Sequence, residues 1–462
     1  MTSSTVPPRL ETSAVSWVRT RLFPNAWSGL LTVLLIPVVA YLGYRIALFV
    51  FVNARWEAVE RNLTLFMQGT FPRDEQWRLV AQILVFALTL GVGAGTSSAS
   101  TRDRALHAGL PYERRTLTSV LRRSWSLIAF VLVLLYFAST LTPWLVVLGA
   151  VALAVAGFQA NRLPTSLRLL GWVLTALLLV IGFQVVSGTT GRAWLVTAIV
   201  SGIGAWSLTE SGRVAPGWRT WALKTGVVAA TTTVVYLIYY FLTIPGIGWD
   251  RWSGLHLTLW VSAISIVLSF PIGLVLALAR RSGFPALRWL ATTYIELVRG
   301  VPLISLLFLG QYVLGFILPP GSTLSSISRA IAAFTLFTAA YVAEIVRGGL
   351  QSLPAGQSEA GQALGLSAVS VTRLIVLPQA LRAVIPAMVG QFISLFKDSS
   401  LLSIIAILEF LGVRSLVHAQ ADFRVIAHAE TLVFVAVGYW AFAFAMSRES
   451  QRLESRLRVG QA

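Results

Sequence analysis

The chain has 462 residues, of which 56% are hydrophobic and only 12% are charged, and its mean hydropathy is +0.76. These values exclude a water-soluble globular protein and predict an all-α polytopic membrane protein embedded in a lipid bilayer. The formal net charge of +18 reflects basic loops between membrane spans rather than a nucleic-acid-binding surface, because the arginines gather in short segments between apolar runs. The chain contains no cysteine, which excludes disulfides and thiolate metal sites.

The first part of the chain predicts a membrane-embedded N-terminal extension. Residues 1–27 are polar and indicate a cytoplasmic segment, and the apolar run that follows is too long for a signal-peptide core. About seven apolar runs of spanning length then fill residues 28–243. These runs are 28–52, 77–97, 125–142, 144–160, 169–187, 193–210 and 222–243.

A second block, residues 254–447, predicts a core of about five spans and brings the total to about twelve. Its runs are 255–279, 301–318, 328–348, 380–398 and 428–447. With the N-terminus inside, alternation places the arginine-rich segment 99–123, the loop 349–379 and the tail 448–462 in the cytoplasm. The main exterior loop is then 53–76, where acidic and basic residues nearly cancel.

Residues 354–378 interrupt the apolar C-terminal third and predict two short helices joined by a glycine. We call this stretch the helix–glycine–helix segment. Pro354 suits the first turn of a helix over 357–364. The residues on one face of that helix are Ala360, Ala363 and Leu364.

Gly365 is expected to end the first helix in a left-handed conformation, and Ser367 to cap the second. The second helix must stop near Leu377, because Pro378 disfavours helical geometry in the residue before it. Its expected shared side carries Val369, Arg373 and Val376. A helix–glycine–helix element between two spans would lie on the cytoplasmic face as a docking element.

Four ordered motifs resemble the amino-acid branch of the ABC importer permeases. Within the helix–glycine–helix segment, 359–361 (EAG), Gly365 and 377–378 (LP) resemble the EAA loop of that family, although Gly361 stands where the family has alanine. The flanking motifs are 294–302 (YIELVRGVP), 341–349 (YVAEIVRGG) and 391–401 (QFISLFKDSSL). Together they extend the resemblance over roughly residues 254–447.

The resemblance implies a permease subunit of an ATP-driven importer that carries amino acids across the bacterial inner membrane by alternating access. It implies ATPase subunits that bind ATP and magnesium, a second permease chain, identical or different, and an extracytoplasmic amino-acid-binding protein. The residues implied in coupling to the ATPase are Glu359, Ala360, Gly361, Gly365, Leu377 and Pro378.

The chain itself is expected not to be an enzyme and to bind neither cofactor nor metal. It has no G-x-x-x-x-G-K-[ST] phosphate loop, and its histidines show no ligand spacing. One alternative is an ion-coupled secondary transporter in which Lys397, Asp398 and Glu344 form a relay; no inverted repeat is visible to support it. Another is a membrane-bound enzyme, which lacks a candidate nucleophile or metal set.

Polar residues near the end of the run 380–398 are costly at membrane depth and indicate a candidate substrate pathway. They are Gln391, Ser394, Lys397, Asp398 and Ser399. A mutual ion pair between Lys397 and Asp398 at the outer interface is the alternative, and the sequence leaves both open.

Two acid–base pairs at i, i+3 spacing are candidates for structural ion pairs that fix the ends of spans. The first is Glu296 with Arg299, and the second is Glu344 with Arg347. Such pairing is favoured over substrate contact for both.

Overall fold

The computed structural model describes residues 18, 20, 22–107, 109, 143–164, 168–188, 246–248, 251–317, 324–424 and 427–458. Within these residues every regular element is helical, and seven helices are long and apolar enough to cross a membrane, or eight if one bent pair is a span. The protein is therefore all-α and polytopic. The predicted runs 125–142, 193–210 and 222–243 lie outside the described residues, so the total of about twelve spans stays a prediction.

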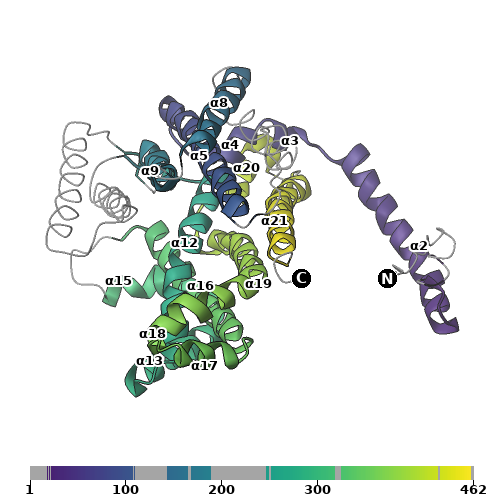
Figure 1. The fold of residues 1–462 in the computed structure, drawn as a ribbon. Coiled ribbons are helices and arrows are strands. Elements are labelled where there is room, and N and C mark those ends of the chain that lie inside the picture. Colours follow the sequence, from purple (N-terminus) through teal and green to yellow (C-terminus); the bar gives the residue numbers. More distant parts are fainter. Residues whose placement is uncertain are drawn as a thin grey trace, which may run out of the picture.

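The first span forms a helix that stands apart from the other helices, on the right of the view (Figure 1). It comprises α2 (Ala26–Leu48) and the π-helical turn η1 (Phe49–Asn53), in agreement with the predicted run 28–52. The Asn25 side chain caps α2 by accepting a hydrogen bond from the Ser28 N–H at 2.8 Å. None of the residues of α2 is buried.

The expected exterior loop 53–76 contains two short helices, α3 (Glu57–Glu60) and α4 (Leu63–Gln68), that pack on the core. Phe66 of α4 is fully buried against the rings of Phe410 and Phe434. The Thr70 N–H donates to the Ser253 hydroxyl at 2.6 Å. The loop is thus a structural part of the protein rather than a free connection.

Three further helices of the N-terminal part pack together. They are α5 (Gln76–His107), α8 (Pro143–Phe158), followed by the 3-10 turn η3 (Gln159–Arg162), and α9 (Arg168–Ser187). A side chain on Gly91 of α5 would collide with the Ala154 carbonyl of α8, so this glycine permits a close crossing of two membrane helices. Gln82 of α5 links this group to the core, because its amide donates to Gly182 O at 2.9 Å and its oxygen lies 3.1 Å from His256 Nε2.

The core is built from long helices and one bent pair. The long helices are α12 (Gly254–Arg280), α16 (Ser326–Gln351), α19 (Leu377–Asp398) and α21 (His428–Arg458). The bent pair is α13 (Pro285–Gly300) with α14 (Leu303–Phe308), η6 (Leu309–Val313) and α15 (Leu314–Ile317). The helix direction changes by 105° between Pro285–Gly300 and Leu303–Val313. The run 301–318 predicted only the second arm, because α13 is amphipathic.

The prediction that the second short helix stops near Leu377 is wrong. Helix α18 (Ala368–Val371) continues through the π-helical turn η7 (Thr372–Val376) directly into α19. Leu377 keeps helical angles of φ −62° and ψ −44°, and its N–H bonds to Thr372 O. The wider π turn accommodates Pro378, which lacks an N–H and would clash with a carbonyl in a regular α-turn.

The core has two ends that are far apart. Helix α12 has 27 residues and is therefore about 40 Å long. Its last residue, Arg280, lies at the end where α16 leads into α17 (Gly356–Ala363), which we call the α17 end. Its first residue, Gly254, forms a bridge with Glu409 at the other end. We call this the α20 end, after α20 (Arg414–His418).

Candidate functional site

The helix–glycine–helix segment has the predicted turn geometry. Helix α17 ends before Gly365, whose φ of +77° is the left-handed conformation that glycine adopts most readily. The Gly365 N–H bonds to Gln362 O at 2.9 Å. Ser367 caps α18 as expected, since its hydroxyl accepts from the Ser370 N–H at 3.3 Å.

Gly361 allows α17 to lie directly against the chain that follows it. It is the buried residue of α17, and a Cβ at this position would lie 2.9 Å from Val371 Cγ2 and 3.0 Å from Ile375 Cδ1. A hydrogen bond of 3.2 Å from Gln379 Nε2 to Gln357 Oε1 further ties α17 to the start of α19. The glycine in place of the expected alanine therefore has a packing reason.

The outer surface of this segment is apolar and exposed. Leu364, Val369 and Leu374 are 80%, 76% and 64% exposed. The expected common side of Val369, Arg373 and Val376 is therefore wrong, because Val376 is buried while Val369 faces outward. Leu364 precedes the candidate span Ala368–Ile405, and Val369 and Leu374 lie on the first turns of that span. Exposed apolar residues at such a junction are typical of a surface that another protein covers. Exposed Glu359 and Ala360 add to this surface, and Leu377 and Pro378 lie at the base of α19.

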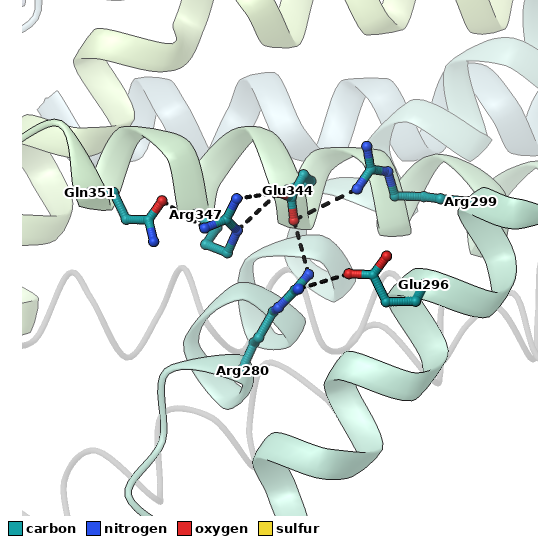
Figure 2. Close-up of polar contacts among 6 residues, drawn as sticks. All are labelled: Arg280, Glu296, Arg299, Glu344, Arg347 and Gln351. Carbon is teal, nitrogen blue, oxygen red and sulfur yellow. Dashed lines mark hydrogen bonds and ion pairs between the residues drawn. The ribbon is translucent and has the colours of Figure 1, made fainter.

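An ion-pair cluster of Arg280, Glu296, Arg299, Glu344 and Arg347 joins three helices at the α17 end (Figure 2). Arg280 of α12 donates from Nη1 to Glu344 Oε2 at 3.0 Å and from Nη2 to Glu296 Oε1 at 2.7 Å. It thus bridges α16 and α13 at once.

Glu344 is the centre of the cluster. Arg347 contacts the Glu344 carboxylate through Nη2 and, at 2.9 Å, through Nε, and its Nη1 donates to Gln351 Oε1 at 2.6 Å. Arg299 Nη1 lies 3.8 Å from Glu344 Oε2 (Figure 2). The structure therefore brings Glu344 and Arg347 together, whereas Glu296 contacts Arg280 instead of Arg299.

Arg280 is the member of the cluster that the motifs did not reveal. Its position at the end of the run 255–279 was visible in the sequence, but i, i+3 spacing identifies only partners on the same helix. The cluster fixes α12, α13 and α16 to one another just before α16 enters the helix–glycine–helix segment.

Four of the five candidate pathway residues lie on the last turns of α19, and Ser399 begins the 3-10 helix that follows. Gln391, Ser394 and Asp398 are half-buried, and Lys397 is exposed. Among the described residues, neither Lys397 nor Asp398 has an ion pair or a hydrogen-bonded side-chain partner, so the mutual pair does not form. Ser399 is fully buried, with its hydroxyl donating to Phe396 O at 2.6 Å and lying 3.3 Å from the Tyr439 hydroxyl.

Glu409 is a buried carboxyl group beside this region that sequence reasoning missed. It accepts hydrogen bonds from the Leu411 and Gly412 N–H groups at 2.7 and 2.8 Å and from the Tyr439 hydroxyl at 2.8 Å. Burial raises the pKa of Glu409 to about 7, against the opposing effect of these hydrogen bonds. In the part of the chain that the structure describes, no group of three His, Asp or Glu side chains is placed to hold a metal ion.

Comparison with known proteins gives consistent matches. Residues 269–459 match the family described as binding-protein-dependent transport system inner membrane component. The inner membrane amino-acid ABC transporter permease protein YhdY of Escherichia coli strain K12 is 40% identical over 250 residues, covering 53% of this chain and 68% of that protein.

Two further relatives have similar names. The glutamate/glutamine/aspartate/asparagine transport system permease protein BztC of Rhodobacter capsulatus is 42% identical over 47% of this chain and 50% of its own length. The probable glutamine ABC transporter permease protein GlnP of Bacillus subtilis is 37% identical over 44% of this chain and 92% of its own length.

Proposed function

Because the chain belongs to the family of inner membrane components of binding-protein-dependent transport systems, we propose that it works as the permease subunit of an ATP-driven amino-acid importer. Its relatives are permeases of amino-acid ABC transporters, which favours this function over ion-coupled transport. Alternating access across the bacterial inner membrane is the expected mechanism. The amino acids named for its relatives include glutamate and glutamine.

The observation that carries the proposal is the exposed apolar surface of the helix–glycine–helix segment, held in place by the ion-pair cluster. We assign this surface to the groove of a separate ATPase subunit, which binds ATP and magnesium. The α17 end is then cytoplasmic, and the α20 end faces the extracytoplasmic binding protein. A rigid shift of α17 driven by the ATPase reaches α12 and α13 through Arg280 and Glu344.

The polar side of α19 supports a substrate route. Gln391, Ser394 and Asp398 recur at spacings that place them along one side of the helix, and this side is only partly covered within the chain. A second permease chain placed against α19 would enclose this polar side. Lys397 then supplies a positive charge near the extracytoplasmic entrance.

The experiment is ATP-driven uptake by the complex of this chain with its ATPase, second permease and binding protein in proteoliposomes. Leu364→Asp is expected to reduce uptake and ATPase co-purification by at least about tenfold, because it places a charge in an apolar interface. Leu106→Asp is the matched control, since Leu106 is also exposed and lies in the other segment expected on that side. Equal uptake by both variants, or uptake that needs an ion gradient instead of ATP, would refute the proposal.

A further inference from the structure

A pocket of about 550 Å³ lies at the α20 end, apart from the helix–glycine–helix segment and the ion-pair cluster. Its lining includes Ser403 and Ala406 from the end of η8 (Ser399–Ile405) and the turn after it. Arg414, His418 and His428 complete its polar wall. Because η8 begins at Ser399, Ser403 in the pocket wall follows the last candidate pathway residue by four positions in the same short helix.

The hydrogen bonds around Thr431 fix how the basic groups are presented. The Thr431 hydroxyl donates to Ala427 O at 2.7 Å, so its oxygen accepts from Arg414 Nε at 3.1 Å and from His418 Nε2 at 3.0 Å. Arg414 Nη2 donates to His428 O at 3.2 Å. The Arg414 Nη1 group has no acceptor among the described residues and stays available to a ligand.

These basic groups have no counter-ion in the part of the chain that the structure describes. The acidic side chains of the surrounding sequence are engaged elsewhere: Glu409 with backbone N–H groups and Tyr439, and Glu430 with the Arg55 N–H at 2.9 Å. Asp422 lies 3.9 Å from Arg61. Among the described residues, the positive charge of Arg414 therefore has no acidic partner in this pocket.

The electrostatics of the pocket also favour an anion. The His418 and His428 rings lie 3.9 Å apart between centroids. Burial, followed by the charges of His428 and Arg414, lowers the pKa of His418. A bound anion would oppose both effects and favour the protonated form of His418.

The pocket also offers acceptors and an apolar wall. The Ser403 and Ser415 hydroxyls donate to Ser400 O and Gly412 O, each at 2.7 Å, which leaves their oxygen lone pairs for an ammonium group. Ile407 and Leu408 supply apolar surface. Donors for a carboxylate, acceptors for an ammonium group and apolar contacts together match a free amino acid.

We propose that this pocket is an outer acceptor site that binds the carboxylate of a free amino acid beside the entrance of the route on α19. The inference rests on the proposed function and adds a site to it. Arg414 provides the principal charge, with His418 and His428 supporting it. An arginine–carboxylate hydrogen bond contributes enough to change affinity about ten- to hundredfold.

The test is equilibrium binding of tritiated L-glutamate and L-glutamine to the purified complex in nanodiscs, without the binding protein. We expect saturable binding that Arg414→Gln weakens about ten- to hundredfold. His428→Gln is a second variant that spares folding, because the His428 side chain is exposed, and it should weaken binding to a smaller degree. Arg424→Gln is the matched control, since Arg424 is exposed in the same region and does not line the pocket.

Absence of saturable binding of either amino acid, or unchanged binding in Arg414→Gln and His428→Gln, overturns the site. The site is also overturned if these variants lose binding-protein-stimulated ATPase activity while their binding of free amino acids is unchanged. That result would mean that the basic residues contact an acidic side chain of the binding protein. ATP-driven uptake by the wild-type complex separates the two claims. If uptake is intact while the pocket binds nothing, only this inference fails.

Discussion

Replacing Glu344 by glutamine should destabilise the protein far more than replacing Glu296. Glu344 faces Arg280, Arg347 and Arg299 and is 22% exposed, whereas Glu296 is 56% exposed and pairs with Arg280 alone. Breaking a buried pair costs about 3–5 kcal/mol, and partial exposure reduces this to about 2–3 kcal/mol for Glu344→Gln. Glu296→Gln should cost about 0–1 kcal/mol, as exposed pairs do.

Thermal unfolding in detergent, followed by tryptophan fluorescence, measures this difference, since the chain has 16 tryptophans and no cysteine for a thiol dye. Glu449→Gln is the matched control, because Glu449 pairs with Arg452 at the same i, i+3 spacing in the more exposed tail. Glu344→Gln should also reduce transport per ATP hydrolysed. Equal melting temperatures for Glu344→Gln and Glu449→Gln, with normal coupling, would show that the cluster does not hold the helices together.

Three other changes test different parts of the structure. Gly361→Val should lower the free energy of unfolding by about 1–3 kcal/mol and reduce ATPase co-purification, because the valine side chain would collide with Val371. Thermal unfolding and a pull-down of the ATPase measure the two effects. Burial raises the pKa of Glu409 from 4.5 to about 7, so the folded state stays protonated to a higher pH than the unfolded state. The free energy of unfolding should therefore fall by about 3 kcal/mol as the pH rises from about 4.5 to about 7. Glu409→Gln should abolish this slope in melting experiments. Lys397→Met with Asp398→Asn should stay defective in uptake and in substrate-stimulated ATPase activity, and full recovery of both would exclude a substrate route there.

Among the described residues, most span positions were predictable because the length of an apolar run is a local property of the sequence. The runs 255–279 and 328–348 correspond closely to α12 and α16. The turn at Gly365 was predictable for the same reason, since a left-handed residue between two helices favours glycine. The continuation through η7 was not, because a π turn removes the conflict that Pro378 otherwise creates.

Contacts between distant segments account for what the sequence did not reveal. Spacing suggested that Arg299 would pair with Glu296, but Arg280 lies closer once α12 and α13 fold together. The sequence did not reveal that the expected exterior loop 53–76 contains helix α4, in which Phe66 fills a space between Phe410 and Phe434. These contacts depend on which helices pack against each other, and the local sequence of one helix does not determine that.

Helix α12 connects the two ends of the core physically. At the α17 end Arg280 holds Glu344 and Glu296, and at the α20 end Gly254 bonds through its N–H to Leu408 O at 2.8 Å, in the wall of the pocket. Helix α12 is continuous over 27 residues, although Pro271 in its interior removes one backbone hydrogen bond and favours a bend there. Under the proposed function, α12 is therefore the element through which a shift of α16 would reach the turn that lines the outer pocket.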